Sequence, residues 1–230
     1  MGRSILSQPV QADRVTIATM RTSWNELERA HLAQALTLAG PGAPTLCEGW
    51  RTEHLAAHVL LRERKPWAVR GGTFERTASA ASARPTFDAL VTTFAGEPAV
   101  WSPARWAGEQ MNLLEYYVHL QDVVRAGPAD GPRLVPEPAH ERALWGHFRL
   151  FARMLYRPAA VGVVLAPVDG SRTVVRRPRS GAGSVVISGR PSELVLHGFG
   201  RGAVADVALD GSAQDVAALS ARFPAPTAQA

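Results

Sequence analysis

Apolar residues recur at helical spacing through the first two thirds of the chain. The Ser-x-x-Glu sequence that begins at Ser23 is a capping box, and it predicts a helix over 24–39. Gly40 and Pro41 then predict the end of that helix. Further helices, each followed by Gly or Pro, are expected over about 53–64, 86–95, 109–126 and 139–156. Residues 68–84, which are rich in Gly, Ser, Thr, Ala and Arg, are expected to form a mobile loop.

The hydrophobic period changes after Pro158. Two apolar runs, 161–165 and 173–175, flank Asp169-Gly170, a pattern typical of a β-hairpin. The remaining expected elements are a strand over 184–187, a helix over 192–199, a strand over 203–209 and a helix over 212–221. A run of helices followed by a small mixed unit predicts the α+β class, with an N-terminal helical bundle and a C-terminal α+β domain.

This pattern divides the chain into four parts. Residues 1–22 lack periodicity and precede the capping box, so they are expected to be a flexible N-terminal extension. The helical bundle is expected over 23–158 and the α+β domain over 159–223, leaving a frayed tail at 224–230.

Composition and charge exclude several functional classes. The net charge of the 230 residues is +5, but Lys65 is the only lysine, and the arginines are scattered, as in proteins from GC-rich genomes. Nucleic acid is therefore not an expected partner. No apolar run is long enough to cross a membrane, and the single cysteine, Cys47, excludes internal disulfides. A cytoplasmic protein is expected.

A Glu-x-x-x-His pattern marks the helix expected over 109–126. Glu115 and His119 lie one turn apart on the same face, and His58 on another helix is able to converge on them in an antiparallel bundle. Two imidazoles and one carboxylate would bind a divalent metal and leave a position open, as in catalytic sites. Zinc suits these ligands, with nickel, cobalt or iron as alternatives. Spacing alone equally allows a plain helix-stabilising ion pair between Glu115 and His119.

Two neighbours of these residues are candidates for supporting roles. Asp122 follows His119 by three positions, so it is expected either to orient that imidazole or to pair with Arg125 on the surface. His54 shares a helix face with His58 but lies in the first turn, where an exposed polar residue is the simpler interpretation.

Basic and thiol side chains offer further candidates. Arg62 and Arg64 lie one to two turns beyond His58, where they would either attract the carboxylates of a substrate or thiol cofactor or form a solvated face. Cys47 has no evident partner that would lower its pKa, so structural packing is the favoured interpretation.

Several sequence blocks resemble one known group of proteins. The segment 50–59 (WRTEHLAAHV) resembles the N-terminal domain of mycothiol-dependent maleylpyruvate isomerases, which are DinB-like metal-binding four-helix bundles. Segments 43–50 and 62–66, together with EYYVH at 115–119, resemble most closely an uncharacterised actinobacterial subfamily of such metal-binding proteins. The resemblance extends from about residue 23 to residue 211.

The resemblance implies a set of site residues. It assigns the metal ligands to His58, Glu115 and His119, whereas His54 falls where the family commonly has Asp. Arg201 matches a Gly-Arg step in the C-terminal domain of the isomerases, where an arginine assists the active site.

The implied function is a metal-dependent isomerase or S-transferase. It would use mycothiol or another small thiol as cofactor and a small electrophile as substrate, in a monomer or a homodimer. The thiolate would add to the substrate transiently in isomerisation or permanently in transfer. Two alternatives stay open: a non-catalytic metal-binding or stress-response protein, and a metal-dependent hydrolase with Glu63 or Asp122 as general base.

Overall fold

The computed structural model describes residues 23–96, 109–127 and 134–224. The expected N-terminal extension therefore lies outside the described residues, as do most of the predicted tail and the loop expected around residues 101–108. None of the described helices is long and apolar enough to cross a bilayer.

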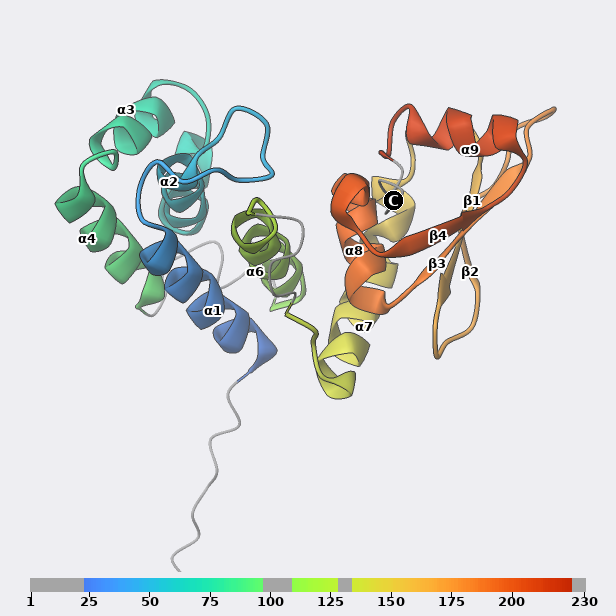
Figure 1. Ribbon diagram of the computed structural model, residues 1–230, viewed down its shortest axis with the longest axis horizontal. Coiled ribbons are helices and arrows are strands. Elements are labelled where there is room, and N and C mark those ends of the chain that lie inside the picture. Colours follow the sequence, from blue (N-terminus) through green and yellow to red (C-terminus); the bar gives the residue numbers. More distant parts are fainter. Residues whose placement is uncertain (1–22, 97–108, 128–133, 225–230) are drawn as a thin grey trace, which may run out of the picture.

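The N-terminal part is built from helices. Their bounds are α1 (Trp24–Ala39), α2 (Thr52–Arg64), α3 (Gly72–Ala80), α4 (Arg84–Ala95) and α6 (Glu109–Val124), with a short 3-10 helix at Pro66–Ala68. Figure 1 shows α1, α2, α4 and α6 as a bundle, with α3 beside α2. The start of α1 is confirmed, because Ser23 and Glu26 exchange both hydrogen bonds of the capping box.

The prediction of a mobile loop over 68–84 is wrong, because helix α3 occupies most of that segment. Phe74 and Ala78 lie one turn apart on α3, and they are only 4% and 1% exposed within the bundle core. An apolar face of two residues on a segment of Gly, Ser, Thr and Arg is too narrow to show as periodicity. Burial against α2 stabilises a helix that the local sequence does not specify.

The C-terminal part is a mixed four-stranded sheet with helices on it. The strands are β1 (Gly162–Pro167), β2 (Thr173–Arg176), β3 (Ser184–Gly189) and β4 (Val207–Asp210), in the order β2-β1-β3-β4. The predicted hairpin is confirmed, since β1 and β2 pair antiparallel, while β1 and β3 are parallel. The helices are α7 (Pro138–Leu155), α8 (Pro191–Gly198) and α9 (Ala213–Ser220).

The strand expected over 203–209 begins later than predicted. Gly202–Val204 forms a 3-10 turn, and β4 starts only at Val207. The carbonyl of Val204 accepts a hydrogen bond from Arg125, which directly follows α6, and Ala205 is buried. These contacts hold the segment against the helices and delay its entry into the sheet.

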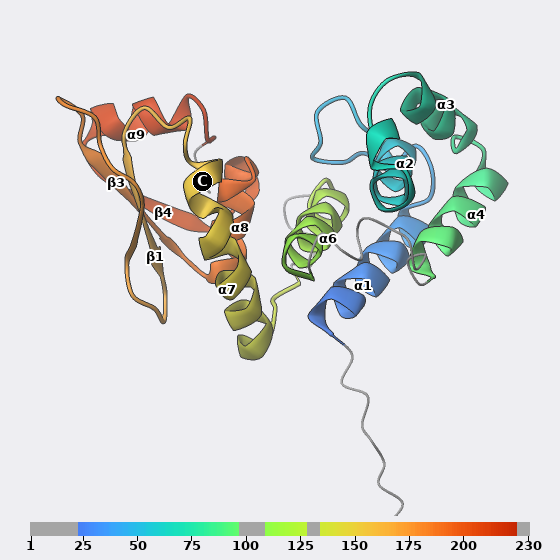
Figure 2. The same ribbon diagram turned by 180° about the vertical axis from the view of Figure 1, so that it is seen from behind.

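Two hydrophobic cores meet at α6. The first core contains residues of helices α1, α2, α3 and α4 together with Tyr116 and Leu120 of α6. The second contains Leu114 and Tyr117 of α6 together with residues of α7, α8 and the sheet. Figure 2 shows α6 between α1 and α7 from the opposite side. The α+β class, with a helical region followed by a sheet unit, is thereby confirmed. Helix α7 contributes Leu144 and Phe148 to the core that contains the sheet.

Candidate metal centre

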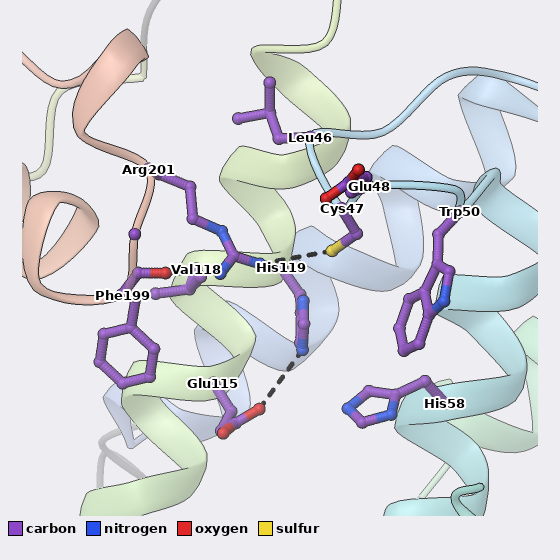
Figure 3. A pocket seen from close by; sticks show the side chains of 11 residues that line it. Leu46, Cys47, Glu48, Trp50, His58, Glu115, Val118, His119, Phe199 and Arg201 are labelled. Atoms are coloured by element: carbon purple, nitrogen blue, oxygen red, sulfur yellow. Dashed lines mark hydrogen bonds and ion pairs between the residues drawn. The ribbon is translucent and has the colours of Figure 1, made fainter. Parts of the chain in front are cut away.

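A pocket of about 420 Å³ opens between the two parts of the protein. Its walls come from α2, from α6, from the loop that precedes α2 and from the turn that follows α8. Figure 3 shows the side chains that point into it, among them His58, Glu115, His119 and Arg201.

The structure brings the three predicted ligands together at this pocket. His58 projects from α2, while Glu115 and His119 project from one face of α6 (Figure 3). A ligand atom from each lies within 4.8 Å of those from the other two. Nε2 of His119 is 3.3 Å from Oε2 of Glu115, and the two imidazole rings meet edge to face, 5.2 Å apart. The helical face predicted from the Glu-x-x-x-His spacing thus exists, and α2 supplies the third group.

Asp122 fixes the orientation of the His119 ring. Its carboxylate is fully buried, and Oδ2 lies 2.9 Å from Nδ1 of His119. The same carboxylate accepts two hydrogen bonds from Arg201, at 2.8 and 2.7 Å, and one from the Cys47 thiol at 3.1 Å. Because a carboxylate only accepts, Nδ1 of His119 carries the proton and Nε2 faces the pocket.

The charged groups at the site are strongly coupled to one another. Burial would lower the pKa of His119, but hydrogen bonds to Asp122, Cys47 and Glu115 outweigh it and raise that pKa to about 10. Burial would raise the pKa of Glu115, yet its bond to His119 and the charge of Arg62 lower it to about 2. Without a metal ion the site thus pairs an ionised carboxylate with a protonated imidazole, and a metal ion that binds there would displace the imidazole proton.

His58 presents a neutral imidazole to the same space. Its Nδ1 is buried and has no hydrogen-bond partner among the described residues. The ring packs against Trp50, with centroids 5.1 Å apart. Burial, followed by the positive charge of His119, lowers the pKa of His58 to about 4. A neutral imidazole in a partly buried position is the form that binds metals.

The two arginines that follow His58 have different surroundings. Nε of Arg62 lies 3.9 Å from Oε2 of Glu115, and its Nη1 donates to Asn112 at 2.9 Å, so Arg62 stands beside the ligand cluster. Arg64 instead reaches the carbonyl of Thr93 on α4, at 3.4 Å, and does not line the pocket. Of the two proposed anion-binding residues, the structure brings only Arg62 near the site.

His54 and Glu63 lie away from the pocket. Nδ1 of His54 accepts a hydrogen bond from the backbone of Arg51, so the imidazole caps the start of α2. Glu63 is buried inside the bundle, where it pairs with Arg29 and accepts a hydrogen bond from Tyr116. The structure therefore contradicts the choice of Glu63 as a general base at the metal site, and it does not bring His54 to the ligands.

Arg201 lines the pocket as part of a hydrogen-bonded clamp. Beyond its two bonds to Asp122, it donates to the carbonyl of Phe199 at 2.6 Å and to the sulfur of Cys47 at 3.3 Å. These bonds tie the turn after α8 to α6. The guanidinium of Arg201 therefore positions Asp122 and Cys47 at the pocket.

Cys47 is a polar pocket residue whose place at the site sequence reasoning missed. The sequence favours a packing role for Cys47, but the residue lines the pocket, and its sulfur is hydrogen-bonded to Asp122 and Arg201. Cys47, His119 and Asp122 form a second group whose ligand atoms lie within 4.8 Å of one another. The backbone bond from Leu46 to the Asp122 carbonyl, 3.0 Å long, carries this loop to α6. No local sequence signal marks such a long-range contact.

The fold and the site together define an α+β protein with a helical bundle, a small mixed sheet and a candidate His-Glu-His centre between them. No protein-family model matches the sequence, and no curated protein matches it. Two solved structures match: mycothiol-dependent maleylpyruvate isomerase, with a TM-score of 0.50, and a histidine-to-alanine mutant of it, with 0.52. Each shares 21% identity over 81% of this chain and 90% of the other. The chain therefore has the fold of this isomerase.

Proposed function

We propose that this protein binds one divalent metal ion and uses it to activate a low-molecular-weight thiol. The observation that carries the proposal is the convergence of His58, Glu115 and His119 at one pocket. The donor set fits a metal, because it combines a carboxylate with two imidazoles, one of which has a buried nitrogen without a partner. Zinc is the ion that we propose, and nickel, cobalt and iron suit the same ligands.

The surrounding residues prepare these ligands. Asp122 accepts a hydrogen bond from Nδ1–H of His119 and so turns Nε2 toward Glu115 and the pocket, while Arg201 and Cys47 hold Asp122 in place. Arg62 lies beside Glu115 and is able to attract an anionic group of a substrate. A bound divalent ion would supply a Lewis acid that deprotonates a coordinating thiol.

The thiol would come from outside the chain. Cys47 is the only cysteine, and its thiol donates to Asp122. The structurally similar isomerase depends on mycothiol, which supports mycothiol as the cofactor here. A pocket of about 420 Å³ has room for the reactive end of a thiol and a small electrophile.

The reaction we propose is addition of the thiolate to an electrophilic carbon. If the substrate has a double bond conjugated to a carbonyl, addition forms a C–S bond and moves the π electrons onto the carbonyl as an enolate. The former double bond then rotates, and the enolate expels the thiolate to restore the double bond as the other isomer. If the C–S bond persists and a leaving group departs or a proton is taken up, the outcome is S-transfer.

The test is an assay of the metal-loaded protein with mycothiol and a panel of conjugated cis-dicarboxylates, epoxides and alkyl halides. We expect product formation by the native protein and by the His54→Ala variant, and a loss of at least about 100-fold in His58→Ala. Equal rates in the native protein and His58→Ala would contradict the proposal. Metal binding without turnover on any electrophile would instead favour the non-catalytic binding protein.

A hydrolase has less support from the site. Hydrolysis needs a carboxylate that is free to take a proton from water. Asp122 is held by Arg201, His119 and Cys47, and Glu63 is buried in the bundle core, so neither suggested base is available.

A further inference from the structure

A second pocket, of about 290 Å³, lies on the other side of α6 from the metal centre. It is bounded by α1, by α6 and by the segment that leads into α7. Figure 1 shows α6 between α1 and α7. Tyr117 and Gln121 of α6 face this pocket, whereas Glu115 and His119 face the metal centre. The two sites therefore share a helix but no lining residue.

Two titratable side chains with unpartnered atoms form the buried wall of this pocket. Glu28 is 3% exposed, and its Oε2 has no hydrogen-bond partner among the described residues. His140 is 4% exposed and its Nε2 likewise has none, lying 3.6 Å from Oε1 of Glu28. The His140 ring is held rigidly, because it stacks on Trp24 at 4.6 Å and meets Tyr117 edge-on. Buried polar atoms of this kind are rare unless water or a ligand satisfies them.

Gln121 contributes a third unpartnered atom, with a fixed orientation. The residue is fully buried, and its Oε1 accepts a hydrogen bond of 2.7 Å from Nε of Arg125. Because a guanidinium only donates, the amide cannot flip, and its Nε2 must be the atom without a partner. A donor from Gln121 and an acceptor from Glu28 thus line one pocket.

The charge of the pocket favours a cation. Two carboxylates, Glu28 and Glu137, line it, and no Lys or Arg stands among its described lining residues, although the protein as a whole carries +5. Burial raises the pKa of Glu28 to about 7, so a positive group beside it would stabilise the ionised form.

A metal ion suits this pocket less well than an organic cation. Glu28, His31 and His140 do not form one of the described groups whose ligand atoms gather within 4.8 Å. Apolar walls from Trp24, Leu27 and Leu120 fit a carbon skeleton instead.

We propose that this pocket binds a small organic amine that also carries an oxygen acceptor. The ammonium donates to Glu28, the oxygen accepts from Gln121, and the apolar part of the molecule packs against Trp24. The proposal does not depend on the function of the metal centre, since it concerns a different set of residues.

The test compares two compounds of almost equal size with the full-length protein. The probe is 2-amino-1-phenylethanol, and the control is 1-phenylethane-1,2-diol, in which a hydroxyl replaces the amine. In isotope-labelled protein we expect the amine to shift the Gln121 side-chain amide resonance and to bind at least about 10-fold more tightly than the diol. Equal binding of the two compounds would overturn the proposal, and so would no binding of either, which would leave a water-filled pocket only.

Matched variants locate the site. Glu28→Gln keeps the shape of the side chain and removes its charge, so it should reduce amine binding to the level of the diol. Glu75→Gln, at an exposed carboxylate on α3 that does not line this pocket, is the control and should bind the amine within about twofold of the native protein. Circular dichroism verifies that both variants fold. Undiminished amine binding by folded Glu28→Gln would contradict the proposal.

Discussion

The carboxylate of Asp122 and the guanidinium of Arg201 meet in two hydrogen bonds, of 2.8 and 2.7 Å, across the boundary between the two hydrophobic cores. Asp122 is on α6, and Arg201 is on the turn after α8. The same carboxylate accepts from Nδ1 of His119. One buried ion pair thus joins the two parts of the protein and orients a proposed metal ligand.

Replacement of Asp122 by Asn should weaken metal binding without removing the ligands. The amide keeps the size of the side chain but loses the charge that makes His119 a better ligand, so we expect affinity to fall about 10- to 100-fold. Competition with a chromogenic chelator measures this change. Asp88→Asn, in an exposed pair with Arg84, is the control. Native affinity in folded Asp122→Asn would show that Asp122 does not support the ligand.

Replacement of Arg201 by Met should destabilise the fold. It removes the guanidinium, one of two cationic partners of the fully buried Asp122 carboxylate, and breaking a buried pair in this way costs up to roughly 3–5 kcal/mol. Urea denaturation measures the free energy of unfolding. Arg84→Met, which breaks an exposed pair, should cost less than about 1 kcal/mol. Equal effects of the two substitutions would contradict a structural role for the Arg201 pair.

Glu28 should make stability depend on pH in a particular direction. Burial raises its pKa from 4.5 to about 7, so between these values the folded protein holds more protons than the unfolded chain. This contribution to stability is lost as pH rises through that window. Glu28→Gln lacks this effect, so its stability relative to the native protein should increase by up to roughly 3 kcal/mol across the window.

The measurement for Glu28 is urea unfolding of both proteins at several pH values. His140 has a pKa lowered by burial to about 4 and acts in the opposite sense in both proteins, so the difference between them reports Glu28 together with its coupling to His140. A constant difference across the window would show that Glu28 titrates normally in the folded state.

Cys47→Ala should leave the metal content unchanged. Cys47, His119 and Asp122 also form a compact group, but hydrogen bonds among them and with Arg201 already engage their atoms. Elemental analysis of the purified variant measures the stoichiometry. Loss of the metal in Cys47→Ala would move the site to this second group.

The sequence indicates the helices and the ligand face because both depend on local spacing. The capping box at Ser23 and the one-turn separation of Glu115 from His119 are properties of a single helix. Helix α3 escaped prediction because only Phe74 and Ala78 form its buried face. Its stability comes from packing against other helices.

The rest of the pocket depends on contacts between distant residues. Cys47 meets Asp122 across 75 positions, and Arg201 meets Asp122 across 79. Neither Cys47 nor Arg201 lies in a local pattern that specifies its partner, so the sequence could suggest them only singly. The orientation of α2 about its own axis within the bundle likewise turns the side chains of Arg64 and Glu63 away from the pocket. This orientation depends on packing between helices, which local spacing does not specify.

The most direct test of the central claim is the metal content of three purified variants beside the native protein. Elemental analysis should find about one divalent ion per chain in the native protein and in His54→Ala, whose imidazole caps α2. His58→Ala and His119→Ala should each retain less than about a tenth of that amount. Native metal content in folded His119→Ala would contradict a metal centre built from His58, Glu115 and His119.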